Sequence, residues 1–366
     1  MNAIPAGVVT PEVLVDVDVL QRNIDRMAGA ARTRGLRLRP HVKTHKVQEI
    51  AALQLAAGAV GLTVATVGEA EVFVAGGARD VFIAYPLWVD APRASRLRRL
   101  AKQARVRLGV DSAEGATAMG QALGEAAADF EVLVEIDSGH HRSGVLPEAT
   151  ASVARAAAEA GLHVVGAFTF PGHSYAPGAA LTAAQDEDVA LASAAAVLRE
   201  AGFEVLELSG GSTPTALLET ATSATELRPG VYVFGDAQQL ELGRCLPDDI
   251  ALTVAATVVS RHEGGSGIPR RCILDAGSKV LGSDRPPWAS GWGRLADHPA
   301  ARITALSEHH ATVVWPDGEP LPSLGERLLV IPNHVCLTMN LVDEVSAVSG
   351  GVVVDRWAVA ARGRNS

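Results

Sequence analysis

Apolar and polar positions follow one pattern over the first two thirds of the chain. From about residue 16 to residue 242, short apolar runs alternate with alanine-rich segments of helical character. Such alternation predicts repeated βα units around a parallel sheet. The predicted strands are 37–42, 62–65, 81–84, 106–110, 131–136, 164–168, 204–208 and 225–227, and the predicted helices include 47–53, 69–75, 91–103, 148–160 and 182–201. Eight strands favour closure into a (β/α)8 barrel.

A doubly wound open sheet would show the same alternation. That fold carries a G-x-G-x-x-G turn after its first strand, and this sequence has none there. We therefore expect the barrel, in which the residues that do chemistry lie just past the carboxyl ends of the strands.

The pattern changes after Pro247, where strands follow one another without long helices between them. The predicted strands are 251–260, 271–275, 311–315, 327–331 and 352–359, separated by glycine-rich turns. The run 11–16 is one strand too many for the barrel, so we expect it to pair with this second domain. The predicted organisation is an α/β chain with a barrel at 17–245 and a mostly β domain at 246–366 that includes 1–16.

Composition and charge narrow the class of protein. The 366 residues are 48% hydrophobic and 20% charged, as expected for a soluble globular protein, and the net charge is −9 with no separate basic block. A nucleic acid or an anionic membrane is therefore not an expected partner. No signal-like start or long apolar run is present, so we expect a cytoplasmic location. The three cysteines, Cys245, Cys272 and Cys336, are too few and too scattered for a disulfide framework.

The first predicted strand ends in a cluster of basic residues that includes Lys43, His45 and Lys46. A lysine at the carboxyl end of a strand can act as an amine nucleophile. A solvated cluster at the start of the next helix is the alternative. Because cations at a helix N-terminus oppose the helix dipole, such a cluster asks for a reason.

Three later strand ends also carry candidate site residues. Asp137 and Arg142 follow the strand 131–136, where a surface ion pair is the alternative. Tyr175 follows the next strand and could be a buried, hydrogen-bonded tyrosine. The run L-E-L-S-G-G-S-T-P-T, with Gly211, Ser212 and Thr213, can hold an anion, because its glycines let backbone amides converge and its hydroxyls donate.

The β domain contains a possible metal pair. His334 and Cys336 are two residues apart on a segment that we expect to be extended, so both side chains would point to the same side and could share one ion. Ordinary packing of a buried histidine and cysteine is the alternative.

These motifs together resemble those of one family. The sequence contains R-P-H-x-K-T-H-K, D-x-G-x-x-R-x-G, G-H-x-Y, S-x-G-S-T-P-T, R-P-G-x-Y and P-N-H-x-C in this order. The order and content are similar to the D-threonine aldolase and eukaryotic-type D-serine dehydratase family, which are fold type III pyridoxal-phosphate enzymes with an alanine racemase-like barrel.

The resemblance implies a role for each candidate residue. It implies that Lys43 holds pyridoxal phosphate as a Schiff base, while Lys46 belongs to the helix that follows. It also implies that Asp137 supports its turn from behind, that His140 and His141 are structural or solvent-facing, and that residues 275–279 shape the mouth of the site. The cofactor residues that it implies beside Lys43 are Arg142 near the phenolate, Tyr175 with His173 beside the pyridine ring, and Gly211, Ser212, Thr213 and Tyr232 at the phosphate.

The implied metal ligands are His334 and Cys336. A cysteine at the second position resembles the dehydratase branch and favours zinc, whereas the aldolase branch has aspartate and a harder metal such as manganese or magnesium. The implied activity is dehydration and deamination of D-serine or another D-3-hydroxy amino acid to a 2-oxo acid and ammonia, with Lys43 removing the α-proton and zinc acting on the β-hydroxyl.

Three other activities remain open. Retro-aldol cleavage to glycine and an aldehyde would use the same residues. An amino-acid racemase needs a second base, which no motif nominates, and a non-catalytic pyridoxal-phosphate carrier would lack the β domain. The resemblance also implies a homodimer.

Overall fold

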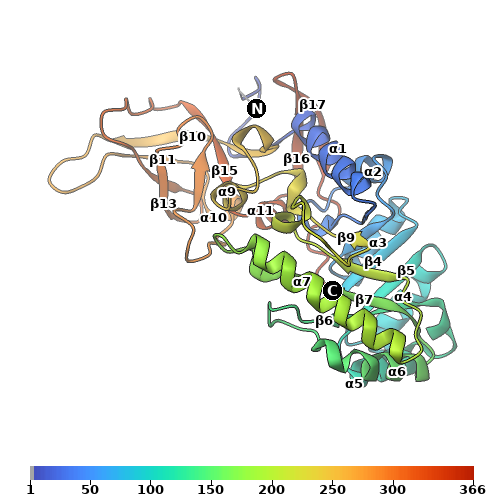
Figure 1. The fold of residues 1–366 in the computed structure, drawn as a ribbon. Helices are drawn as coiled ribbons and strands as arrows, with labels where there is room; N and C mark the ends of the chain where they lie inside the picture. Colours follow the sequence, from blue (N-terminus) through green and yellow to red (C-terminus); the bar gives the residue numbers. More distant parts are fainter. Residues whose placement is uncertain (1–3) are drawn as a thin grey trace. The chain divides into compact units, whose positions relative to one another are not determined.

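The computed structural model describes residues 4–366 and divides the chain into two compact units (Figure 1). The barrel unit comprises Arg26–Lys43, Ile50–Gly230 and Gly363–Ser366, and the β unit comprises the described residues up to Asp25, Thr44–Glu49 and Val231–Arg362. The segment 231–250 belongs to the β unit and bonds within it. Ala251 N, for example, donates to Phe234 O at 2.7 Å. The domain limits 17–245 and 246–366 stay a prediction.

The barrel unit contains the predicted ring of eight parallel strands. Their order is β2-β9-β8-β7-β6-β5-β4-β3, and a bridge between His41 and Thr63 joins the two ends, with Thr63 N donating to Pro40 O at 2.8 Å. The predicted barrel is thereby confirmed. The strands are β2 Arg37–Leu38, β3 Leu62–Val64, β4 Asp80–Pro86, β5 Arg105–Val110, β6 Glu131–Ile136, β7 His163–Thr169, β8 Glu207–Gly210 and β9 Glu226–Leu227.

Two of the barrel strands differ from their predicted bounds by three residues or more at one end. β2 ends at Leu38 and not at residue 42, because Pro40 has no amide hydrogen for the ladder and Val42–Thr44 form a turn of 3-10 helix. β8 begins at Glu207, three residues later than predicted. Lys43 still follows β2, and Ser212 and Thr213 still follow β8.

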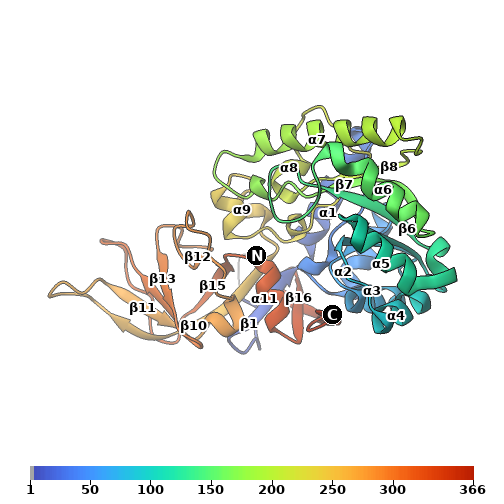
Figure 2. The same cartoon turned by 90° about the horizontal axis from the view of Figure 1, so that it is seen from below.

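Helices cover the outer side of the strands, and Figure 2 shows α4, α5 and α6 along this side. The helix α3 begins at the N-cap Thr66, whose hydroxyl accepts from Glu69 N. Asp90 and Ser112 cap α4 and α5 in the same way. The helices are α1 Val17–Thr33, α2 Gln48–Ala56, α3 Val67–Ala75, α4 Ala91–Ala101, α5 Ala113–Leu123, α6 Thr150–Glu159, α7 Ala180–Glu200 and the short α8 Thr213–Ala216.

The amino-terminal ends of the strands carry a buried to half-buried group of charges that we call the ionic cluster. Arg39 donates to Glu226 at 2.7 Å and to Asp80 at 2.6 Å, and Arg107 donates to Glu131 at 2.8 Å. Each of the four acids is the first residue of its strand. The ionic cluster consists of Arg39, Asp80, Arg107, Glu131, Glu207 and Glu226.

The β unit is built on a nine-stranded sheet. The strand β1 pairs antiparallel with β10 and parallel with β16, so the predicted pairing of run 11–16 with this unit is confirmed. The strands β12, β13 and β16 were absent from the prediction. The strands are β1 Glu12–Asp16, β10 Leu252–His262, β11 Arg271–Leu274, β12 Gly293–Leu295, β13 Arg302–Leu306, β14 Ala311–Val314, β15 Arg327–Pro332, β16 Glu344–Ser349 and β17 Val352–Ala358, and the helices are α9 Ala237–Glu241, α10 Ser278–Leu281 and α11 Val335–Leu341.

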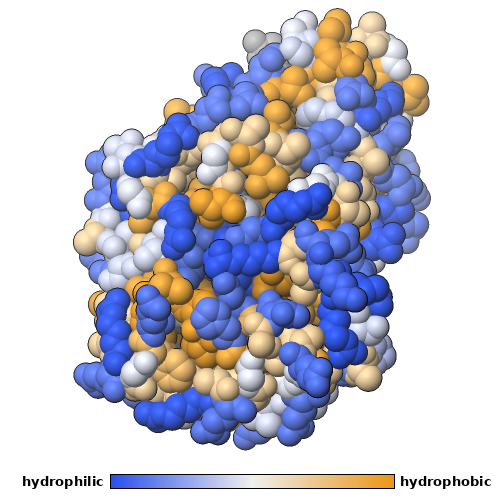
Figure 3. Space-filling view, turned by 90° about the vertical axis from the view of Figure 1, so that its right-hand side faces the viewer, coloured by the Kyte–Doolittle hydropathy of each residue, from blue (hydrophilic) through white to orange (hydrophobic). Residues whose placement is uncertain are grey.

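The surface carries a mixture of residue types. On the face shown in Figure 3, hydrophilic and hydrophobic residues are interspersed. Within residues 4–366, none of the helices has both the length and the apolar character that a bilayer crossing requires.

Candidate active site

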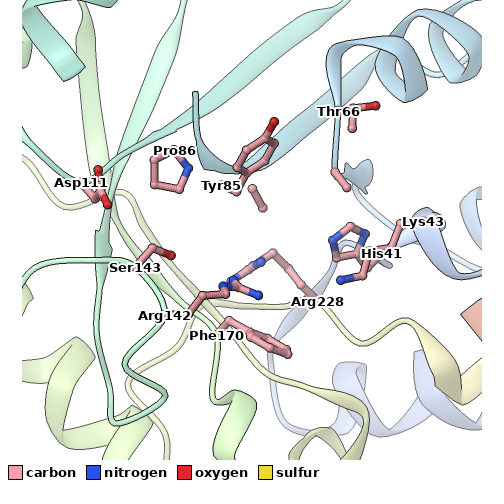
Figure 4. Close-up of a pocket in the computed structure, with 12 residues that line it drawn as sticks. His41, Lys43, Thr66, Tyr85, Pro86, Asp111, Arg142, Ser143, Phe170 and Arg228 are labelled. Carbon is pink, nitrogen blue, oxygen red and sulfur yellow. The ribbon is translucent and has the colours of Figure 1, made fainter. Parts of the chain in front are cut away.

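A cavity of about 560 Å³ lies at the carboxyl ends of the barrel strands (Figure 4). Lys43 reaches it from the segment after β2, Arg142 from the loop after β6, Phe170 from the end of β7, and Arg228 from the residue after β9. Figure 4 shows these side chains around one space, with Tyr85 on its other side. The strand exits thus bring together residues that are almost 190 positions apart in the sequence.

Two cations face the same aromatic ring in this cavity. The Lys43 Nζ atom lies 6.0 Å from the centroid of the Phe170 ring, and the Arg142 Cζ atom lies 5.2 Å from it. Both distances are within reach of a cation–π attraction. Arg142 is half exposed and comes no closer than 3.9 Å to its nearest acid, Glu135, so its guanidinium can bind an anionic ligand.

His41 lines the cavity next to these cations as a neutral imidazole. Burial, together with the positive charges of Lys43, Arg228 and Arg142, lowers the pKa of His41 well below its ordinary value of 6.5. Its Nδ1 atom is buried and has no hydrogen-bond partner among the described residues. His41 is the third residue of the basic motif but was not among the predicted site residues.

Arg228 forms the floor of the cavity. Its Cζ atom lies 5.6 Å from the ring of Phe82 and 5.3 Å from that of Phe168, and its Nε donates to Ser209 Oγ at 2.9 Å. It also donates to Thr169 O. Burial lowers its pKa. Arg228 is the first residue of the R-P-G-x-Y motif and was not among the predicted site residues. Its position directly after a strand was the sequence feature that indicated a place in the site.

The turn after β6 is held by Asp137, as the prediction of a supporting role required. Its carboxylate accepts from Gly139 N at 2.9 Å and from His141 N at 3.0 Å. Burial raises the pKa of Asp137, but these amides lower it further, so the net shift is downward. His141 is exposed, and His140 packs edge-on against Phe170 with ring centroids 5.6 Å apart. Both histidines are structural or solvent-facing, as predicted.

His173 and Tyr175 lie beside this cavity and not among the residues that line it in the described structure. The centroid of the Tyr175 ring is 6.2 Å from that of the Phe170 ring, and Phe170 lines the cavity. His173 Nε2 lies 3.2 Å from Asp186 Oδ2 on α7. Their contact with a cofactor stays a prediction.

The segment Gly210–Thr213, here called the glycine turn, runs from the last residue of β8 to the first residue of α8. Gly211 has φ +82°, and a Cβ atom there would lie 2.9 Å from Leu227 Cδ2, so the turn requires glycine. Ser212 Oγ lies 2.9 Å from Ser174 Oγ. The Thr213 hydroxyl is buried and has no hydrogen-bond partner among the described residues. A buried hydroxyl without a partner is available to donate a hydrogen bond to an acceptor ligand.

The Gly211 amide of the predicted anion site is already engaged. The Gly211 N–H donates to Glu187 Oε2 at 2.8 Å, so this amide does not stand free for an anion. Glu187 belongs to α7 and is buried, and burial raises its pKa to about 7 against the opposing effect of the Gly211 amide. A signal for it existed in the sequence. Residues 183, 190, 191 and 194 are among the buried positions of α7, and position 187 shares their helical face.

Tyr232, predicted at the phosphate, lies in the β unit. It is buried within the 3-10 turn Val231–Val233. Its contact with a cofactor stays a prediction.

The predicted metal pair is not on an extended segment. His334 has an extended backbone, but Cys336 lies in the first turn of α11, because Asp236 Oδ2 accepts from Val335 N at 3.4 Å where that helix begins. The two side chains still meet. Burial lowers the pKa of His334, but Cys336 and Asp284 raise it more, so the net shift is well upward.

The His334 imidazole is oriented by a carboxylate. Its Nδ1 atom lies 2.5 Å from Asp284 Oδ2. Histidines that bind metals usually have such a partner on the second ring nitrogen. Among residues 4–366, however, no group of three or more His, Cys, Asp or Glu side chains has the geometry of a metal site. The pair therefore offers two protein ligands, a nitrogen and a sulfur.

Two further predictions concern flanking segments. Lys46 is not part of the following helix, which begins at Gln48. Its φ is +58°, and its backbone O accepts from Ala361 N at 3.1 Å. In the predicted mouth segment 275–279, Asp275 accepts from Thr257 N at 2.7 Å. Its effect on access to the site stays a prediction.

Comparison with known proteins agrees with this arrangement. Residues 15–238 match the family model "Alanine racemase, N-terminal domain", and residues 251–348 match "Putative serine dehydratase domain". D-threo-3-hydroxyaspartate dehydratase of Delftia sp. is 37% identical over 95% of this chain and 96% of its own. D-threonine aldolase of Arthrobacter sp. is 34% identical over 98% of this chain and 94% of its own.

Solved structures show the same fold. The Delftia dehydratase superposes with a TM-score of 0.87 at 34% identity, covering 96% of this chain and 97% of that one. A cysteine-to-alanine mutant of that dehydratase, in the metal-free form, has the same TM-score, identity and coverage. D-threonine aldolase from Filomicrobium marinum has a TM-score of 0.82 at 32% identity, over 98% of both chains.

Proposed function

This chain belongs to the family that joins an alanine racemase-type N-terminal domain to a serine dehydratase domain, as its motifs predicted, and from that membership we propose a pyridoxal-phosphate-dependent lyase. The proposed reaction is elimination of water from a D-3-hydroxy amino acid to give a 2-oxo acid and ammonia. The relatives named above act on substrates of this class. We also propose that the protein is a cytoplasmic homodimer.

The residues of the barrel unit fit the cofactor. The amine of Lys43 faces the cavity, the cations Arg142 and Arg228 can accept its negative groups, and the buried Thr213 hydroxyl is without a partner in the described structure. We assign Lys43 as the attachment point, Arg142 to the phenolate, and Ser212 and Thr213 to the phosphate. His173 and Tyr175 are assigned to the ring and Tyr232 to the phosphate. When bound, pyridoxal phosphate supplies an electron sink for the α-carbon.

The protein's own part in the reaction is to hold and move a proton. Lys43 has the only amine among the residues that line the described cavity, and we assign it the removal of the substrate α-proton. The neutral His41 beside it adds no charge that would repel an ammonium group. The Lys43 and Arg142 side chains both lie against the Phe170 ring, which limits the directions from which Lys43 can act.

The observation that carries elimination over other reactions is the His334–Cys336 pair. A thiolate is a soft ligand and favours zinc over manganese or magnesium. Asp284 orients the imidazole so that Nε2 can bind a metal. A metal held there would act as a Lewis acid on the leaving hydroxyl.

Retro-aldol cleavage to glycine and an aldehyde is the second candidate. It is favoured by the match to D-threonine aldolases along the whole chain. The cleavage would use the same residues, and a harder metal such as manganese or magnesium would suit it better.

Product analysis tests the proposal. The purified protein, supplied with pyridoxal phosphate and zinc, is incubated with D-serine, D-threonine and D-threo-3-hydroxyaspartate in turn, with the L enantiomers as controls. We expect ammonia and a 2-oxo acid in equal amounts from at least one D substrate. Glycine with an aldehyde would instead establish the aldolase reaction, and turnover of L substrates alone would contradict both candidates.

A further inference from the structure

Glu187 presents a problem that the proposed site does not solve by itself. Its carboxylate lies directly behind the glycine turn, where it accepts from Gly211 N at 2.8 Å. A Cβ atom on Gly210 would lie 2.8 Å from Glu187 Oε1, so Gly210 lacks a side chain where the carboxylate needs space. The acid therefore belongs to the turn as built and is not a chance neighbour.

The proposed phosphate ligands directly follow this contact in the sequence. Gly211 is joined to Ser212, and the unpartnered hydroxyl of Thr213 is one residue further. The phosphate monoester of the cofactor carries about two negative charges above pH ~6. A charged Glu187 would thus be a like charge behind the turn that holds the phosphate, in a buried setting where water screens it poorly.

The other charged groups around Glu187 do not remove this conflict. Arg228 and Arg34 favour its charged form, and Asp188, the next residue on α7, disfavours it. Arg228 already donates to Ser209 Oγ, and Asp188 accepts from Ser223 N at 2.6 Å. Burial outweighs these influences and raises the pKa of Glu187 to about 7, so a small further influence changes its charge near neutral pH.

We propose that Glu187 takes up a proton when the cofactor phosphate binds at the glycine turn, so that this carboxyl couples cofactor retention to pH. The inference rests on the proposed function, since it assumes the phosphate at Ser212 and Thr213. Glu187 acts as a positioning residue: neutral, it still accepts from Gly211 N and keeps the turn in shape. As pH rises above the value at which Glu187 loses its proton in the free protein, binding must bring a proton back, and affinity falls by up to tenfold per pH unit.

The test uses pyridoxamine 5'-phosphate as probe and the cofactor-free full-length protein, because this probe does not bond covalently to Lys43. Calorimetric titration at pH 7.5 in two buffers of different ionisation enthalpy measures the proton uptake directly and needs no variant. We expect a substantial fraction of one proton per probe bound. In parallel, the Kd is measured from pH 6.5 to 8.5 for the wild type, Glu187→Gln and the matched control Asp188→Asn.

The expected result is a Kd that rises with pH more steeply in the wild type and in Asp188→Asn than in Glu187→Gln. Any titration of the probe itself is common to the three proteins and cancels in the comparison. Equal slopes in all three proteins, or binding without proton uptake, would overturn the role of Glu187 and leave the proposed function intact. If Ser212→Ala combined with Thr213→Val does not weaken probe binding, the phosphate assignment is wrong and the role of Glu187 falls with it, whereas the proposed lyase activity is decided by the product analysis above.

Discussion

The change Thr213→Val should move stability and cofactor affinity in opposite directions. The Thr213 side chain is 92% buried, since its relative exposure is 8%, and its hydroxyl has no partner in the described part of the chain. Valine has nearly the same shape, so the change replaces an unsatisfied hydroxyl by a methyl group and leaves the packing alone. The change should therefore stabilise the cofactor-free protein and remove one hydrogen-bond donor from the cofactor-bound protein.

The size of each effect follows from the same hydroxyl. An unsatisfied buried polar group costs about 1–3 kcal/mol, so the cofactor-free variant should gain that much. For a unit of this size the gain corresponds to roughly 2 to 12 °C in the thermal midpoint. A hydrogen bond to a charged group contributes about 1.5–3 kcal/mol, so the Kd for pyridoxal phosphate should rise about 10- to 150-fold.

Thr215→Val is the matched control two residues away. The Thr215 hydroxyl accepts from Ser212 N at 3.0 Å, so its removal leaves a buried donor unpaired and should lower the midpoint of the free protein. Both midpoints are read by thermal denaturation of cofactor-free protein, and affinity by titration with the cofactor. If Thr213→Val destabilised the free protein and left the Kd unchanged, its hydroxyl would have no part in binding a phosphate.

Three other results are expected. Borohydride reduction should attach the cofactor covalently to the wild type and to Lys46→Met but not to Lys43→Ala, as read by mass spectrometry; the reverse pattern would contradict the assignment. Cys336→Asp should shift the metal preference from zinc toward manganese, measured by metal analysis after dialysis, and an unchanged preference would count against a metal role. Burial raises the pKa of Glu226, but Arg39 lowers it more, so the net shift is downward from the ordinary value of 4.5. The stabilising charge of Glu226 is therefore present above pH 4.5 and is lost as pH falls further. Arg39→Met should weaken folding by about 3–5 kcal/mol at neutral pH and reduce this acid sensitivity, as measured by urea unfolding at several pH values.

The sequence predicted the barrel because its strands are fully buried, and buried parallel strands read as continuous apolar runs. It predicted that Lys43 and Arg142 lie at the carboxyl ends of the strands, where both line the cavity, because residues after such strands meet at one rim. The helical spacing of Glu187 indicated the buried face of α7, but its bond to Gly211 N could not be predicted, because the two residues lie on separate elements. The error at Cys336 has a similar cause: the helix α11 begins there on account of Asp236, a residue 100 positions away in the sequence.

The ionic cluster also has a consequence for how this protein could be altered. Four strands begin with an acid that is paired with Arg39 or Arg107. A shift of one residue in any of these strands would therefore separate a charge of the ionic cluster from its partner. Strand register is thereby fixed from one rim of the barrel, while the reaction is run from the other. We therefore expect that loops at the carboxyl ends of the strands can be exchanged without disturbing strand pairing. Such exchanges could change which bond of the substrate a lyase on this barrel cleaves.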